Sequence, residues 1–193
     1  IFAFDDGKRS ILKRSNGLGL DLDKHLNNNR ISLQQVDPAE LSPGEFTNLV
    51  CEAVEKEKVR VVIIDSLNGY INAMPEERFL IIQMHELLSY LNQRGIATFL
   101  VVAQHGLIGT MNSPVDLSYL ADTVIMLRYF EALGKVEKAV SVLKRRSGNH
   151  EKSIRRIRFS EKGIEVGEPL ERFRGVLGGI PEIVESAQRP ENP

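Results

Sequence analysis

The feature that most constrains the fold is an unbroken run of aliphatic side chains that ends in a carboxylate. Residues 61–64 read Val-Val-Ile-Ile, and Asp65 and Ser66 follow them directly. A strand with apolar side chains on both faces is typical of a parallel sheet that helices cover on both sides. The carboxyl ends of such strands form the edge at which open α/β sheets bind ligands. The sequence therefore predicts an α/β fold with Asp65 at the ligand-binding edge of its sheet.

Strand-like and helix-like segments alternate through the first two thirds of the chain, which favours parallel βαβ units. Ser42, Pro43 and Glu45 form a capping box, with serine at the cap, proline in the first turn and glutamate three residues after the serine. The helix that starts there is expected to run to about Lys58. Strands are predicted at 1–4, 30–36, 59–64, 96–103 and 123–129, and further helices from about Ser10 and over 75–94.

The pattern changes after residue 135, where short turns join three further strand-like segments: 136–144, 153–159 and 163–166. They predict an antiparallel β extension at the C-terminal end of a mostly parallel sheet with flanking helices. We expect one domain over 1–180 and a loose tail over 181–193, which contains three prolines. We also expect the segment 123–129 to be a third fully buried strand, after 59–64 and 96–103.

Composition excludes several classes of protein. The formal net charge is −1, so no overall basic field favours nucleic acid or an anionic membrane. No apolar run approaches the ~18 residues of a membrane span. A single cysteine, Cys51, cannot form an internal disulfide, which favours a reducing cytoplasm. The four histidines lack metal-ligand spacing, so we expect no zinc site.

Carboxylates follow two of the predicted strands. Asp65 can hold Mg²⁺ while the metal bridges nucleotide phosphates, although many α/β proteins simply end a strand in aspartate. Asp5 and Asp6 follow the first strand, where a carboxylate can orient and deprotonate an attacking water. The alternative for this pair is an acidic cap on the helix that follows.

Two further groups suit nucleotide phosphates. Gln104 ends the strand 96–103 and can sense a terminal phosphate by hydrogen bonding; the alternative is a satisfied polar strand end. Lys144 and Arg146 share one face of an extended segment, because side chains alternate along a strand. Two cations on one face can clamp a phosphate, while the alternative is a solvated basic edge strand.

Several motifs, in order along nearly the whole chain, resemble the KaiC-like family of RecA-type ATPases. They are VVIIDSLNGY at 61–70, MPEERF at 74–79, AQHGLIG at 103–109, LADTV at 120–124, KRRSGNH at 144–150 and GVLGGIP at 175–181. The chain looks most like the C-terminal ATPase domain of double-domain bacterial members of the family.

The resemblance implies ATP as the substrate with Mg²⁺, and a hexameric ring with ATP bound between subunits. It implies the Walker B role for Asp65 and a contact from Lys144 and Arg146 to the neighbouring subunit's nucleotide. Asp5 and Asp6 fall where the family usually has two catalytic glutamates. Because aspartate is one methylene shorter than glutamate, this departure puts the rate of hydrolysis in doubt.

The family also phosphorylates itself on adjacent serine and threonine residues, in the segment that matches 117–123. Ser118 matches the serine, whereas Tyr119 replaces the threonine. The replacement puts a two-site phosphorylation cycle, and with it a clock role, in doubt.

The phosphate-binding loop of such an ATPase ends in Gly-Lys-Ser/Thr at a helix start, and this chain contains no such sequence. In the family the loop, its strand and its helix precede the segment that matches Ile1, and that strand lies inside the sheet. We therefore expect the chain to be part of a longer protein, with a gap between buried strands where that strand is missing. The alternative is a degenerate domain.

Three functions remain open on this evidence. The leading one is an ATP-hydrolysing signalling protein, and candidate Ser/Thr autokinase, that acts as a homo-oligomeric ring with a signalling partner. The second is a nucleotide-inactive module that forms rings or binds a partner. The third is a recombinase-like DNA-binding ATPase, but its DNA loop at 106–119 would contain no Lys or Arg.

Overall fold

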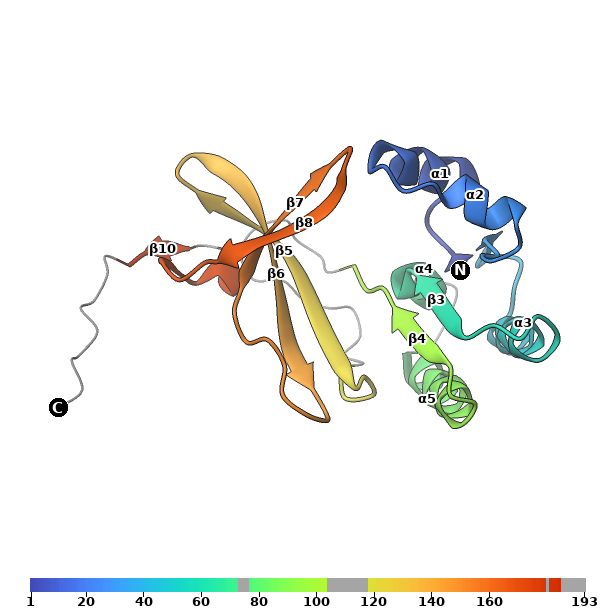
Figure 1. Ribbon diagram of the computed structural model, residues 1–193. Coiled ribbons are helices and arrows are strands. Elements are labelled where there is room, and N and C mark those ends of the chain that lie inside the picture. Colours follow the sequence, from blue (N-terminus) through green and yellow to red (C-terminus); the bar gives the residue numbers. More distant parts are fainter. Residues whose placement is uncertain (73–76, 104–117, 180, 185–193) are drawn as a thin grey trace. The chain divides into compact units, whose positions relative to one another are not determined.

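The computed structural model describes four stretches of the chain: residues 1–72, 77–103, 118–179 and 181–184. They form two compact units (Figure 1). The first contains Ile1–Ala103 together with residues 118–120, and the second begins at Ala121. We describe each unit in turn.

The first unit is built on a parallel sheet of four strands in the order β2-β1-β3-β4. Each strand pairs directly with the next, so the gap that we expected in the sheet does not fall between these four strands. In this register Ala3 lies opposite Asp65, which brings the ends of β1 and β3 together. The strands are β1 (Phe2–Ala3), β2 (Gln34–Gln35), β3 (Val61–Asp65) and β4 (Ala97–Leu100).

The helices of this unit begin and end largely where local sequence signals place them. The capping box at the start of α3 is confirmed: the Glu45 amide donates to Ser42 Oγ at 3.3 Å, and the Ser42 amide donates to Glu45 Oε2 at 2.8 Å. Gly95 follows α5 with φ +69°, a conformation that glycine adopts without strain. The helices are α1 (Lys8–Gly17), α2 (Leu22–Asn27), α3 (Pro43–Lys56), α4 (Leu67–Asn72) and α5 (Glu77–Gln93).

Helices α3, α4 and α5 bury one face of the sheet. An aromatic cluster lies at its centre, where the Phe46 ring stands 5.5 Å from Phe2, 5.2 Å from Phe4 and 5.0 Å from Tyr70. The buried core is Phe2, Phe4, Val36, Phe46, Val50, Val54, Val62, Ile64, Leu67, Tyr70, Met84, Leu87 and Leu91.

The opposite face of the same sheet is exposed in the part of the chain that the structure describes. Val61 on β3 is 50% exposed and Phe99 on β4 is 54% exposed. The prediction that both of these strands are buried on both faces is therefore wrong for the described residues. The aliphatic run identified a parallel strand, but it did not reveal which face the helices cover.

The second unit is an antiparallel sheet in the order β5-β6-β7-β8, as predicted for the C-terminal extension. The segment 123–129 belongs to this sheet, so the prediction of a third buried parallel strand is wrong: Ile125 is 58% and Leu127 is 61% exposed. A short turn explains the difference. Leu133 (φ 52°) and Gly134 (φ 69°) connect β5 to β6, and two positive φ values match the tight hairpin turns that force an antiparallel partner.

The strands of this unit are β5 (Thr123–Ala132), β6 (Lys135–Arg145), β7 (Arg155–Ser160) and β8 (Gly163–Pro169), followed by the β9–β10 pair (Phe173–Arg174 and Glu182–Ile183). A small core beside the sheet contains Phe130, Ala132, Ala139 and Val176, with Ile154, Leu170 and Phe173 packed against it. Among the described residues, no helix is long and apolar enough to cross a membrane.

Candidate functional site

The carboxylate of Asp5 is attached to the end of the neighbouring strand. The Phe4 amide donates to the carbonyl of Asp65 at 2.7 Å, which extends the β1–β3 pairing beyond Ala3. Ser66 then donates to Asp5 Oδ2 from its backbone amide at 3.3 Å and also from its hydroxyl. Asp5 and Asp65, which are 60 positions apart in the sequence, therefore lie at one edge of the sheet.

Close packing against α4 also positions Asp5. A Cβ atom built on Gly69 would lie 2.6 Å from Phe4 Cβ and 2.8 Å from Asp5 Oδ1. Real Cβ atoms essentially never approach other atoms so closely. Glycine at position 69 therefore lets the backbone of α4 approach the Asp5 carboxylate.

Asp6 has a different partner. Its Oδ2 atom accepts a hydrogen bond from Arg14 Nη2 at 2.6 Å, and the two side chains are 34% and 59% exposed. The alternative that Asp5 and Asp6 cap the next helix is not seen, because Gly7 is the N-cap of α1 and no side chain caps it. Asp5 therefore contacts Ser66 at the sheet edge, and Asp6 contacts Arg14.

The Asp65 carboxyl lies in an electronegative setting. Burial raises the pKa of Asp65 above its ordinary value, and the charges of Asp6 and Asp5 raise it further, while Arg14 opposes them. Both effects make the ionised form of Asp65 costly in the absence of a nearby cation. A bound cation would relieve this cost.

The donor atoms at this edge fit Mg²⁺ in a particular way. Among the described residues, no group of three or more His, Cys, Asp or Glu side chains could hold a metal ion, so an all-protein cage is not present there. Mg²⁺ commonly uses only one or two protein carboxylates and completes its shell with waters and substrate phosphates. Asp65, with Asp5 and Asp6 close enough to affect its pKa, suits that second arrangement.

The chain directly before Gln104 is held by Asn68. The Asn68 side-chain amide donates to the Ala103 carbonyl at 2.8 Å, and the Ala103 amide donates to Asn68 Oδ1 at 2.7 Å. This pair of hydrogen bonds connects α4 to the end of the β4 segment. Gln104, the predicted phosphate sensor, lies outside the described residues.

Lys144 lies near the end of β6 in the second unit, and Arg146 directly follows that strand. Lys144 is opposite Val124 on β5 and is partly buried, whereas Arg146 is exposed. Arg146 contacts Asp122 twice: its amide donates to the Asp122 carbonyl at 2.7 Å, and its guanidinium lies 3.1 Å from the Asp122 carboxylate. Any contact of the Arg146 side chain with a phosphate would therefore compete with Asp122.

Ser118, the predicted phosphorylation position, lies in a turn and its side chain is exposed. Tyr119 beside it is 51% exposed, and the next residue, Leu120, packs against the core of the first unit. Ser118 is thus an exposed serine two positions before a residue that is anchored in the core.

Sequence reasoning missed three residues of this site: Ser66, Gly69 and Arg14. Ser66 and Gly69 both lie in the run 61–70, so their position next to Asp65 was the available signal. Nothing in the local sequence indicated that Asp5 would be their contact. Arg14 is one of four cations in α1, and its spacing of two helical turns from Asp6 was the available signal there.

The sequence of this chain is similar to those of several known proteins. A family model described as "ATPase: KaiC" matches residues 1–171. Similar proteins include the circadian clock protein KaiC3 of Synechocystis sp., 24% identical over 181 residues, which cover 94% of this chain and 36% of that protein. The circadian clock oscillator protein KaiC of Synechococcus elongatus is 21% identical over 191 residues, which cover 99% of this chain and 37% of that protein.

A shorter stretch is more similar to the circadian clock oscillator protein KaiC of Acaryochloris marina, at 37% identity over 68 residues, or 35% of this chain and 13% of that protein. The chain spans a little over a third of the length of the first two relatives, at 36% and 37%.

Proposed function

The chain belongs to the KaiC family of ATPases, and from this premise we propose that the protein binds ATP with Mg²⁺ and hydrolyses it. The observation that carries the proposal is the meeting of Asp5 and Asp65 at one sheet edge, where Ser66 links them. Ligands of α/β folds bind at this edge.

Each carboxylate has a proposed role. Asp65 holds Mg²⁺, which neutralises phosphate charge when it is bound. Asp5 or Asp6 orients the attacking water and accepts its proton, a role that requires a carboxylate within hydrogen-bond reach of that water. Asp5 is exposed and Asp6 is partly exposed, so solvent reaches both.

The remaining predicted residues complete the proposal. Gln104 senses the terminal phosphate, and Lys144 and Arg146 contact the nucleotide of the neighbouring subunit in a hexameric ring. Ser118 is the proposed position of autophosphorylation, which makes the protein a candidate Ser/Thr autokinase. Its signalling partner would be a protein that reads the state of the ring.

Hydrolysis by the complete protein tests the central claim. Metal binding contributes several kcal/mol to such reactions, and about 1.4 kcal/mol corresponds to a tenfold change in rate. We therefore expect Asp65→Asn to lower Mg²⁺-dependent ATP hydrolysis about 100-fold. Asp23→Asn, which changes a partly exposed carboxylate of α2 that accepts a hydrogen bond from Asn16, is the matched control and should leave the rate unchanged. Equal rates in the wild type and Asp65→Asn would refute the proposal.

A second candidate function rests on a separate observation. The chain has aspartates at positions 5 and 6, where the family usually has glutamates. A nucleotide-inactive module that forms rings or binds a partner would have these features. Calorimetric titration of the complete protein with Mg²⁺ and ATP distinguishes the two functions, since tight binding is expected only for the first.

Phosphorylation is tested by mass spectrometry after incubation with Mg²⁺ and ATP. We expect a phosphate on Ser118 that is absent from Ser118→Ala and from Asp65→Asn. A phosphate that persists in Asp65→Asn would point to a contaminating kinase and would exclude self-phosphorylation at this site.

A further inference from the structure

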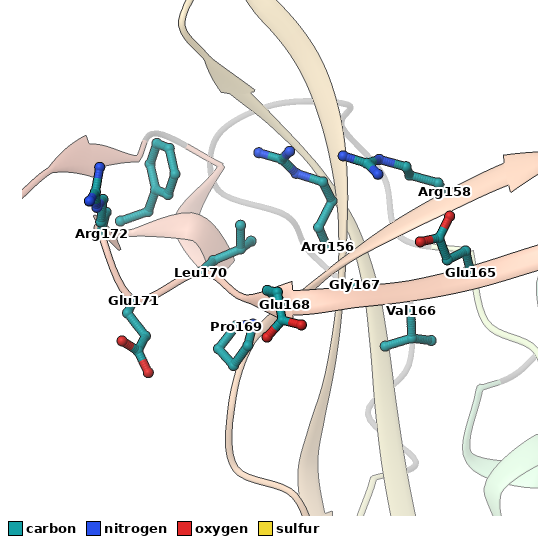
Figure 2. A pocket seen from close by; sticks show the side chains of 11 residues that line it. Arg156, Arg158, Glu165, Val166, Gly167, Glu168, Pro169, Leu170, Glu171 and Arg172 are labelled. Carbon is teal, nitrogen blue, oxygen red and sulfur yellow. The ribbon is translucent and has the colours of Figure 1, made fainter.

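A cavity of about 530 Å³ opens in the second unit, between β7, β8 and the segment that leads to β9 (Figure 2). It lies within the size range of small-molecule sites, which is roughly 300–1,000 Å³. None of the residues proposed for ATP chemistry lines it. A ligand in this cavity would therefore be distinct from the nucleotide of the proposed ATP site.

Two arginines project from the same face of β7 into this region. Arg156 and Arg158 are two positions apart, and side chains alternate along a strand, so their guanidinium groups lie on one side. Figure 2 shows both guanidinium groups on the same side of the strands; the Glu165 carboxylate also lies on that side, near Arg158, whereas Glu168 and Glu171 point away from them. This side of the cavity, which we call the cationic wall, therefore carries two guanidinium groups and one carboxylate.

Among the described residues, neither of these guanidinium groups forms a hydrogen bond to a carboxylate. Nε of Arg156 is buried without a hydrogen-bond partner, although the same atom forms a long ion pair with Glu137 Oε2 at 3.6 Å. Arg158 has no ion pair among the described residues, although Glu165 is its cross-strand neighbour. Each guanidinium offers five N–H donors in a planar fork, a geometry that can donate to a bound oxyanion.

An apolar surface borders the cationic wall. Leu170 and Phe173 line the cavity and pack against the second core, where the Phe173 ring lies 6.0 Å from Phe130. Gly167 is also part of the lining, and a Cβ atom there would lie 3.8 Å from Arg156 Cβ. A side chain at this position would therefore contact Arg156 and occupy part of the lining.

We propose that this cavity binds an organic oxyanion. Its phosphate or carboxylate group lies between Arg156 and Arg158, and its apolar part lies against Leu170 and Phe173. Guanidinium groups bind both kinds of oxyanion through paired, charge-assisted hydrogen bonds. The site is independent of the proposed ATPase activity, because it uses different residues.

Calorimetric titration of the complete protein with two matched probes, phenyl phosphate and benzoate, tests the site. Each probe has one aromatic ring and one oxyanion, so the one that binds identifies the anionic group. We expect the double variant R156Q/R158Q to bind at least about tenfold more weakly than the wild type. The matched control is R174Q, which changes an exposed arginine of β9 that does not line the cavity.

A second pair of variants separates binding from folding. R158Q alone changes an exposed side chain without a described ion pair, so it should retain the wild-type melting temperature and still weaken binding. G167V leaves both arginines in place but fills the space beside Arg156, and it should also weaken binding. The inference is overturned if neither probe binds the wild type, or if R158Q and G167V bind the probes as the wild type does.

Discussion

Ser66 donates two hydrogen bonds to a single oxygen of Asp5, one from its backbone amide at 3.3 Å and one from its hydroxyl. The two residues are 61 positions apart in the sequence. Because Ser66 directly follows Asp65, this contact joins the two carboxylate-bearing strand ends at one edge of the parallel sheet. The position of Asp5 thus depends on Ser66 as well as on its own strand.

Substitution of Ser66 by alanine should loosen the attachment of Asp5, because only the hydrogen bond from the backbone amide remains. Ser66 is only 4% exposed, and hydrogen bonds to charged groups contribute roughly 1.5–3 kcal/mol, so we expect a loss of about 1–2 kcal/mol in the free energy of unfolding. If Asp5 acts on the attacking water, kcat for ATP hydrolysis should fall while KM stays close to wild type. Urea unfolding and steady-state kinetics measure the two effects. Ser10→Ala, on the exposed side of α1, should change neither.

Gly69→Ala should displace Asp5 by direct steric conflict. The added methyl would lie 2.6 Å from Phe4 Cβ and 2.8 Å from Asp5 Oδ1, and overpacking of this kind typically costs about 1–3 kcal/mol. Gly44→Ala is the matched control, since a Cβ there meets nothing within 4 Å and alanine favours the helix. We expect thermal melting to show a lower Tm for Gly69→Ala and an equal or higher Tm for Gly44→Ala. Equal stability of Gly69→Ala and the wild type would show that the backbone of α4 can move away from Asp5.

Asp65→Asn should stabilise the metal-free protein at neutral pH. Folding raises the pKa of Asp65, mainly through burial, so the protonated form is favoured in the folded state. The stability contribution of this carboxyl is therefore present at low pH and is lost as pH rises through the folded pKa. Urea unfolding in EDTA should show Asp65→Asn more stable than wild type at pH 7.5, with the difference shrinking toward pH 4. A difference that grows on acidification would contradict the assigned direction of the shift.

Glu151 should show the opposite dependence on pH. Hydrogen bonds from Ser153, together with one from Arg155, lower the pKa of Glu151 to about 2. Its stabilising contribution is present above the ordinary pKa of a glutamate and is lost as pH falls toward 2. Glu151→Gln should therefore lower the free energy of unfolding at pH 7 and have a smaller effect near pH 3. Unfolding curves at both pH values measure this, with the exposed Glu161→Gln as the control.

The sequence correctly predicted the elements that depend on interactions between residues close together in the chain. The capping box at Ser42 and Glu45 involves residues three positions apart, so its hydrogen bonds could be read directly from the sequence. The same holds for the aliphatic strand that ends in Asp65. The assignment of 123–129 to the parallel sheet failed because an apolar strand pattern does not specify the partner strand. The two-residue connection at Leu133 and Gly134 decides that partner.

By itself the sequence determined that this chain has a parallel α/β unit with Asp65 at a strand end and an antiparallel extension after it. These features follow from side-chain periodicity and capping, which act over a few residues. Only the tertiary structure decided that Ser66 and Gly69 position Asp5, that Asp6 pairs with Arg14, and that Arg146 contacts Asp122. Most of these contacts depend on how strands distant in sequence align, which requires the whole sheet to form and has no local signature.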